Sequence, residues 1–414
     1  MSAPDVPIWQ LRARFAAALS TMYGAEVPAY TTLVEVSAAV NRDFVATHPH
    51  AERLGSIERV TAERHGAIRV GTPAELTDVA DLFAAFGMYP VGYYDLREAT
   101  SPVPVVSTAF RPVEATELAH NPFRVFTSML ASRDSRFFDA DLRHRVDEFL
   151  RRRTLFDPVL IADARRIAAD DGCDADTAQD FVARAVAAFA LSREPVDRAW
   201  YTELTAVSAV AADIAGVPTT HINHLTPRVL DIDDLYRRMS ARGVAMIDAI
   251  QGPPRWDGPD VLLRQTSFRA LAEPRHFREE DGTVTEDTLR VRFGEVEARG
   301  VALTRKGRER YDAAMACADP AAVWGDYFPR SDDEMASQGL AYYHRGDPSA
   351  PVVYEDFLPA SAAGIFRSNL DTDAEAAAGA DESGYSMDWM AGTIGHHIHD
   401  PYDLYDATAQ EPPA

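Results

Sequence analysis

The sequence has 414 residues, of which 46% are hydrophobic and 25% are charged, and this composition is typical of globular proteins and excludes disordered and fibrous classes. Its formal net charge of −23 argues against nucleic acid or an anionic membrane surface as a partner. Two cysteines, Cys173 and Cys317, are too few for a disulfide framework or a cysteine-rich zinc site, and no apolar run approaches the roughly 20 residues that cross a bilayer, so we expect a cytoplasmic protein without a targeting segment.

The first part of the chain predicts helices followed by a mixed segment. Residues 6–50 carry apolar side chains at helical spacing. A short β-prone run at 67–70 ends at a Gly-Thr-Pro turn, and residues 74–86 resume the helical pattern with Thr72 as the helix cap. Residues 87–108 are rich in Tyr, Val and Pro, which predicts strands joined by turns.

The remainder of the chain alternates again between the two patterns. Residues 114–215 return to helical spacing, which predicts a helical insertion. A β-prone texture follows at 217–233 and again at 285–303. After residue 370 the sequence is acidic and rich in Ala and Gly, and we expect an exposed loop over 371–384.

An internal repeat is the most informative feature of the sequence. The pattern His-x-x-x-Arg-Val occurs at 65–70 and again at 224–229, and in both copies a turn and a helix follow, with a leucine eleven positions after the histidine. Two such βα units would bring two imidazoles together at a pseudo-twofold centre, which is the geometry of a metal site. We therefore predict His65 and His224 as metal ligands. His221 is the alternative to His224 as the second ligand, although it is not followed by the x-x-x-Arg-Val pattern of the repeat.

These paired units resemble the vicinal-oxygen-chelate superfamily, in which paired βαβββ modules each supply a histidine from the first strand and a later strand supplies a glutamate. The resemblance implies an α+β fold with a curved sheet around the metal, and it makes Glu295, in the pattern Phe293-x-Glu, the third ligand. Glu297 shares the face of that strand and stays an alternative ligand or a neighbour of the metal site. The expected division of the chain is a helical N-terminal segment (1–62), a first metal-binding module (63–113), a helical insertion (114–215), a second metal-binding module (216–370) and a C-terminal tail (371–414).

More of the chain resembles one branch of this superfamily, the 2-oxoadipate dioxygenase/decarboxylase family. The matching segments are ERHGAIRVGT (63–72), MYPVGYYDL (88–96), STAFRP (107–112), HINHLTPRVLDID (221–233), RFGEVEARGVALTRKGR (292–308) and VYEDFLPASAAGIF (353–366). Members of this family convert 2-oxoadipate and O2 to D-2-hydroxyglutarate and CO2 with a mononuclear Fe(II), in lysine breakdown. The resemblance therefore implies Fe(II) as the cofactor, with a 2-oxo dicarboxylate and O2 as the small-molecule partners.

The resemblance also assigns residues to roles. It implies His65, His224 and Glu295 as the iron ligands, with both histidines at the substrate as well, and Arg69 as the catalytic arginine that binds the substrate carboxylate. Ala360 and Ser361 fall where the family places its substrate-selective pair. The family usually has Val at the position of Ala360, so the substrate chain length is left open.

The chemistry of these residue types agrees with an oxygenase. Two imidazoles and one carboxylate leave three adjacent positions on an octahedral ion for a 2-oxo acid and O2. On a strand His65 and Arg69 share one face and lie about 13 Å apart, so the guanidinium can bind a carboxylate at a substrate's length from the metal. Arg111 and Arg264 are the alternative arginines for binding the substrate carboxylate.

Other functions and sites stay open at this point. A glyoxalase-like lyase or isomerase would need an additional base, for which Glu297 or Glu355 could serve, and a binding protein of the same fold would need none. We expect the tail histidines to lie in a loop, because three histidines within four residues cannot all converge on one ion from a single strand or helix. These tail histidines are His396, His397 and His399.

Overall fold

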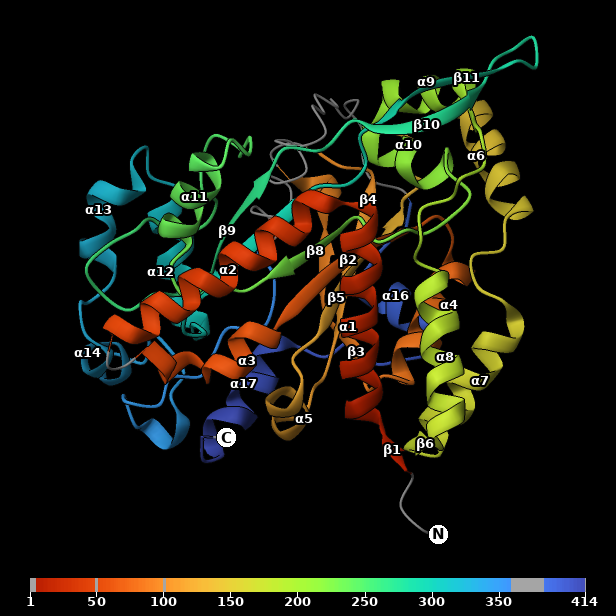
Figure 1. Ribbon diagram of the computed structural model, residues 1–414. Helices are drawn as coiled ribbons and strands as arrows, with labels where there is room; N and C mark the ends of the chain where they lie inside the picture. The colour runs from red at the N-terminus through yellow and green to blue at the C-terminus, as the bar shows by residue number, and fades with distance from the viewer. Residues whose placement is uncertain (1–4, 49–50, 100–101, 359–382, 414) are drawn as a thin grey trace.

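The computed structural model describes residues 5–48, 51–99, 102–358 and 383–413 (Figure 1). It is a mixed α+β structure in which helices surround a central sheet. Ala360 and Ser361 lie outside the described residues. No described helix combines the length and the apolar character needed to span a bilayer.

The central sheet has five strands in the order β3-β4-β5-β2-β8. Strand β2 lies between β5, to which it is parallel, and β8, to which it is antiparallel. On the far side of β8, the Val229 N–H donates to the carbonyl oxygen of Glu297 at 2.8 Å, so β12 continues the surface of the sheet, and β9 pairs with β12. The strands are β2 (Arg64–Val70), β3 (Tyr89–Asp95), β4 (Val105–Arg111), β5 (Arg124–Leu130), β8 (His224–Pro227), β9 (Leu263–Phe268) and β12 (Gly294–Arg299).

Alternating residues of these strands build two separate cores. Ile68 and Val125 face a core that includes the buried side chains of the first two helices, which cross in front of the sheet in Figure 1. Ala67 and Phe126 are the chain neighbours of Ile68 and Val125, and they face the opposite side of the sheet. There they pack with apolar residues of α6 (Ala140–Arg152), α9 (Arg198–Val207) and α10 (Ala209–Ala215). Because side chains alternate along a strand, the second side also receives His65 and Arg69.

Several helices follow the sequence prediction closely. Leu11, Phe15 and Leu19 are buried along one face of α1, at the spacing that predicted it. Helix α4 begins with Pro73 after Thr72, whose side chain accepts from the Glu75 N–H in a capping box. The helices before the insertion are α1 (Ile8–Glu26), α2 (Pro28–Thr47), α3 (Ile57–Ala62), α4 (Pro73–Ala84) and α5 (Ala115–His120).

The predicted helical insertion is wrong over residues 124–130, which form strand β5 in the middle of the sheet. All seven residues of β5 are buried, so the strand has no polar alternation, and its apolar residues can be fitted to a helical period equally well. The strand also lies beyond residue 113, the predicted end of the first module. The helices that do follow are α6 (Ala140–Arg152), α7 (Pro158–Ala169), α8 (Ala175–Ala187), α9 (Arg198–Val207) and α10 (Ala209–Ala215).

The predicted strand at 217–233 is much shorter in the structure, because only His224–Pro227 form β8 and the helix α11 (Ile232–Ala241) begins soon afterwards. The β-prone stretch at 285–303 is confirmed by β11 and β12. Strands β10 and β11 form a hairpin that joins β7 rather than the central sheet. The smaller strands are β1 (Val6–Pro7), β6 (Gly172–Cys173), β7 (Val196–Asp197), β10 (Glu273–Arg278) and β11 (Val284–Leu289).

The C-terminal part of the chain is largely helical where it is described. The predicted loop over 371–384 falls almost entirely outside the described residues. The tail histidines lie in the connection between α16 and α17, as predicted, and His399 forms a bridge with Val91 at the edge of the sheet. These helices are α12 (Arg305–Met315), α13 (Pro320–Tyr327), α14 (Asp332–Ser337), α16 (Met387–Ile394) and α17 (Pro401–Gln410).

Candidate metal centre

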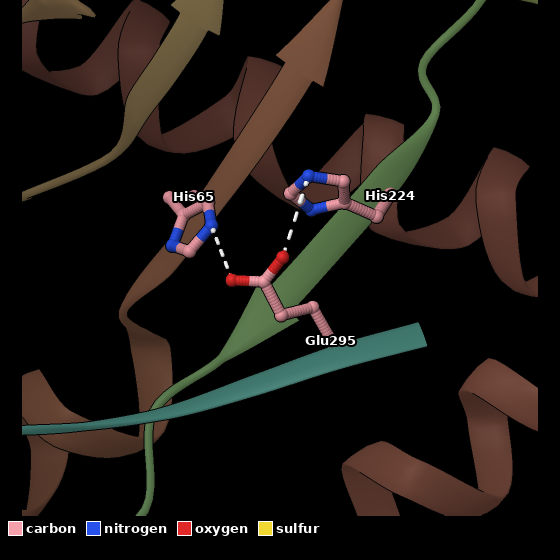
Figure 2. A group of neighbouring side chains, drawn as sticks. All are labelled: His65, His224 and Glu295. Carbon is pink, nitrogen blue, oxygen red and sulfur yellow. Dashed lines mark ion pairs between the residues drawn. The ribbon is translucent and has the colours of Figure 1, made fainter. Parts of the chain in front are cut away.

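Three buried side chains from three neighbouring strands converge at the centre of the sheet. The pairing of β2 with β8 sets Ala67 opposite His224, so His65 and His224 lie diagonally on the same face. His65 Nε2 is 3.4 Å from Glu295 Oε1, and His224 Nε2 is 3.5 Å from Glu295 Oε2. Figure 2 shows each imidazole facing its own oxygen of this carboxylate. Among the described residues this is the one group of three His, Cys, Asp or Glu side chains whose ligand atoms gather closely enough to hold a metal ion.

The far side of each imidazole is held by another polar group. His65 Nδ1 lies 2.9 Å from Glu297 Oε2, and His224 Nδ1 lies 3.0 Å from the Thr226 hydroxyl. These contacts orient both Nε2 atoms toward the centre, as the outer partners of metal-bound histidines do. Glu297, the alternative ligand, therefore contacts His65 from behind.

Aromatic rings and an amide complete the surroundings of the three groups. The ring of His224 stacks on Phe293 at 5.0 Å, and the ring of His65 meets Phe357 edge-on at 5.0 Å. The Gln265 side chain donates to Glu295 Oε1. This packing leaves the donor atoms little freedom to turn away from one another.

The electrostatics of the centre suit a cation. Burial raises the pKa of Glu295. Burial, together with the neighbouring His65 and Arg69, lowers the pKa of His224 well below its usual value. Burial by itself would also lower the pKa of His65, but Glu297 and Glu295 raise it above its usual value. A metal ion bound here would displace the proton of this cluster and take over its stabilising charge.

Behind His65 lies a network of three carboxylates and four guanidinium groups, all of them buried except the half-buried Arg59. The carboxylate of Glu297 accepts from Arg299 Nε at 2.7 Å and Nη2 at 2.9 Å, and Glu63 is paired with Arg124 at 2.8 Å and with Arg228 at 2.9 Å. Although burial opposes ionisation, Arg299, His65 and Arg124 lower the pKa of Glu297 to about 2. The remaining members of the network are Arg59 and Glu355, which form an ion pair with each other.

The two arginines of the sequence repeat have different surroundings. Arg228 belongs to the network behind His65, where it binds Glu63 and the carbonyl oxygen of Leu54. Arg69 lies on the same face of β2 as His65, as predicted, and is buried in an ion pair with Asp213 of α10. Asp213 was not among the residues predicted from the sequence. Its only signal was a lone charge within an alanine-rich helical stretch, and that helix is buried from residue 210 onward.

The other arginines considered from the sequence are engaged elsewhere. Arg264 pairs with Ala298 across β9 and β12, so its side chain lies on the face of the sheet opposite to Glu295 and Glu297. There it binds Asp233 at 2.7 Å. Arg111 binds Asp356 through two hydrogen bonds of 2.7 and 3.1 Å.

The remaining sequence candidates do not join the centre. The rings of His397 and His399 are 5.2 Å apart, but the described residues supply no third ligand group near them. His221 is a buried polar residue whose Nε2 lies 3.1 Å from Asp213 Oδ1, so it does not replace His224 in the group.

Comparisons with known proteins agree with the resemblance found in the motifs. A model of the 2-oxoadipate dioxygenase/decarboxylase family matches residues 15–369. A 2-oxoadipate dioxygenase/decarboxylase from Mycobacterium bovis is 77% identical and covers 97% of each chain, and one from Pseudomonas putida is 40% identical and covers 95% of this chain and 93% of its own. The crystal structure of the hydroxyglutarate synthase from Pseudomonas putida in complex with 2-oxoadipate matches with a TM-score of 0.82 at 36% identity, over 99% of this chain and 97% of that one.

The family model covers both histidines of the repeat and the strand that carries Glu295. The relatives match nearly from end to end, so the similarity includes the insertion and the second half of the sheet as well as the centre. The chain therefore belongs to the 2-oxoadipate dioxygenase/decarboxylase family.

Proposed function

We propose that this protein is an Fe(II)-dependent dioxygenase and decarboxylase that converts 2-oxoadipate and O2 to D-2-hydroxyglutarate and CO2. The observation that carries the proposal is the convergence of His65, His224 and Glu295 in a buried centre of a chain that belongs to this family. Cys173 and Cys317 are free thiols, which is typical of proteins in a reducing compartment, and we propose that the protein is cytoplasmic.

The donor set fits Fe(II). Two histidines and one carboxylate on one side of an octahedral ion are the ligands of non-haem Fe(II) oxygenases, and they leave three positions for a bidentate 2-oxo acid and O2. Iron supplies the activation of O2, which side chains cannot perform. The residues around it hold both imidazoles in place through Glu297 and Thr226, and the rings of Phe293 and Phe357 limit the access of water.

Arg69 is the proposed partner of the substrate's distal carboxylate. It extends from the same face of β2 as His65, four residues or about 13 Å further along the strand, with the small side chain of Ala67 between them. A planar guanidinium binds a carboxylate through two parallel hydrogen bonds, which favours a 2-oxo dicarboxylate over a monocarboxylate. By resemblance to the family, Ala360 and Ser361 complete the selection of chain length.

The centre lies between two units of similar construction, which we propose to be the paired βαβββ modules of the vicinal-oxygen-chelate fold. The first is β2-α4-β3-β4-β5. The second begins with β8 and α11, continues with the stretch 245–251, which is hydrogen-bonded to β9, and ends with β9 and β12. The β10–β11 hairpin is inserted between β9 and β12. Both units place their first strand beside the last, in parallel.

The glyoxalase-like alternative requires a base that neither candidate supplies well. Glu297 is held ionised by Arg299 with a pKa of about 2. Burial opposes ionisation of Glu355, but Arg59 and Arg124 still lower its pKa. A carboxylate whose pKa is depressed in this way is a weak proton acceptor at neutral pH.

The test is an oxygen-electrode assay with the Fe(II)-loaded protein and a series of 2-oxoglutarate, 2-oxoadipate and 2-oxopimelate. We expect O2 uptake, CO2 release and D-2-hydroxyglutarate formation in equal amounts with 2-oxoadipate, and no uptake without Fe(II). Chiral analysis of the product establishes the hand. A protein that binds Fe(II) but consumes no O2 with any of these acids would refute the proposed reaction.

A further inference from the structure

A second buried polar cluster lies beside the metal centre. Asp213 on α10 forms an ion pair with Arg69 Nη1, lies 3.1 Å from His221 Nε2 and accepts from Asn223 Nδ2 at 2.9 Å. We call Arg69, Asp213, His221 and Asn223 the Asp213 cluster. All four side chains are buried.

The cluster is tied directly to the strands that carry the histidine ligands. The Asn223 N–H donates to the Ala67 carbonyl oxygen at 2.9 Å, which extends the pairing of β8 with β2 by one residue. The Tyr23 hydroxyl donates to the carbonyl oxygen of Asn223 at 3.0 Å and to that of Phe293 at 2.8 Å. The carboxylate of Asp213 is therefore fixed relative to β2, β8 and β12 together.

Three atoms of the cluster still have hydrogen-bonding capacity. His221 Nδ1, Asn223 Oδ1 and Asp213 Oδ1 are buried and have no hydrogen-bond partner within the described parts of the chain, although Asp213 Oδ1 lies 3.1 Å from His221 Nε2. Buried polar atoms are nearly always satisfied by protein, ordered water or a ligand. The cluster thus combines a fixed cation, the Arg69 guanidinium, with polar atoms that could form hydrogen bonds with a bound molecule.

We propose that Asp213 is a positioning residue that fixes the Arg69 guanidinium for the distal carboxylate of a 2-oxo dicarboxylate, and that His221 and Asn223 hold Asp213 in turn. This inference rests on the proposed function of Arg69. An arginine side chain has several freely rotating bonds, and a bidentate contact with a carboxylate requires one orientation of its plane. Asp213 supplies that orientation before the substrate arrives, and its charge balances Arg69 in the buried site.

The expected consequence is a selective loss of dicarboxylate binding. Asp213→Asn keeps the size of the side chain and one acceptor oxygen but removes the charge that holds Arg69. The hydrogen bonds between a guanidinium and a carboxylate are charge-assisted and depend on geometry, so we expect their loosening to raise the Kd and KM for 2-oxoadipate by about 10- to 100-fold. The Kd for 2-oxohexanoate, which has the same chain length without the distal carboxylate, stays the same, as do kcat and the Fe(II) content.

The experiment measures Kd for both acids by anaerobic calorimetry on the Fe(II)-loaded protein, together with kcat and KM for 2-oxoadipate. Asp134→Asn is the matched control, because Asp134 is also buried and paired with a buried arginine, Arg97, at 3.0 Å. His221→Gln is a milder second variant, which loosens Asp213 without removing it, and we expect a smaller rise in the same direction. In an Arg69→Lys background Asp213→Asn should have no further effect, because the group that it positions is gone.

The outcomes separate this inference from the proposed function. Equal losses for both acids, an unchanged or tighter Kd for 2-oxoadipate, or a selective loss in Asp134→Asn as well would overturn the role of Asp213. If Arg69→Lys loses dicarboxylate binding while Asp213→Asn and His221→Gln do not, Arg69 keeps its proposed role and this inference alone fails. If wild-type protein binds 2-oxoadipate no better than 2-oxohexanoate, the proposed role of Arg69 fails first.

Discussion

Glu297 offers the sharpest test of how the buried network supports the metal centre. Its carboxylate has one oxygen 2.9 Å from His65 Nδ1 and accepts two hydrogen bonds from Arg299. Glu297→Gln keeps the shape of the side chain but removes its negative charge. We expect both weaker metal binding and a less stable metal-free protein.

The magnitudes follow from the contacts. A residue that orients a metal-bound histidine contributes about 10- to 100-fold to metal affinity, which corresponds to roughly 1.4–2.7 kcal/mol. Breaking a buried ion pair costs about 3–5 kcal/mol, because the partner is left uncompensated. The loss for Glu297 should lie at the lower end of that range, because Glu63 Oε1 lies 3.5 Å from Arg299 Nε and still balances part of its charge.

Thr226→Val is the matched control, because Thr226 contacts the far nitrogen of His224 as Glu297 contacts that of His65, but without a charge. A neutral hydrogen bond contributes about 1 kcal/mol, so this variant should lose less than tenfold in metal affinity. The assays are chelator competition for the Kd of Fe(II) and urea unfolding of the metal-free proteins. If folded Glu297→Gln binds Fe(II) with the wild-type Kd, or if Thr226→Val loses more affinity than Glu297→Gln, the reasoning is wrong.

Four further predictions concern the centre and its surroundings. His224→Ala should abolish stoichiometric Fe(II) binding while the circular dichroism spectrum stays native, and an unchanged metal content would exclude this residue as a ligand. Arg69→Lys should retain iron but lose most of kcat/KM for 2-oxoadipate, because an ammonium group cannot reproduce the planar fork; wild-type kcat/KM would show that another group binds the carboxylate. Ala360→Val should move the preference toward shorter 2-oxo acids, since one methylene contributes about 1–3 kcal/mol to discrimination, and an unchanged ranking across the series would argue against a role in the pocket. The lowered pKa of Glu297 stabilises the metal-free protein at pH values above 4.5, the ordinary pKa of a glutamate. About 3 kcal/mol of the free energy of unfolding should be lost as the pH falls from 4.5 toward about 2, and urea titrations of Glu297→Gln should not show this loss.

The convergence of His65, His224 and Glu295 could be predicted from the sequence because its signals are local. His65 and His224 each begin a short motif in which a strand, a turn and a helix follow at fixed spacing, and the structure forms these elements as expected. Glu295 was found through the resemblance of its strand to a known pattern, and it lies between the two histidines. Spacing along one strand also placed Arg69 on the face of His65, because alternation is a property of the strand itself.

Two other features depend on contacts with other parts of the chain, and their local sequence does not identify them. Strand β5 is buried on both faces between β2 and β4, so polar alternation could not distinguish it from a helix. Asp213 is explained by its partners Arg69 and Asn223, which are 144 and 10 residues away in the chain. A charge within an alanine-rich helix can be exposed to solvent or paired in the interior, and the sequence of the helix does not distinguish the two.

The register of the two halves of the sheet explains why the centre has three protein groups. Arg69 lies opposite Ser128 on β5, and Arg228, the matching arginine of the repeat, lies opposite Glu297 on β12. Ser128 therefore corresponds to Glu297, and Phe126, two residues earlier, corresponds to Glu295. A phenyl ring cannot ligate a metal, and Phe126 instead packs against Phe357 at 5.1 Å, which in turn meets the ring of His65. One half of the sheet thus supplies a histidine and a carboxylate, whereas the other supplies a histidine and an apolar wall. An octahedral ion held by these three groups would keep three adjacent positions for the proposed 2-oxo acid and O2.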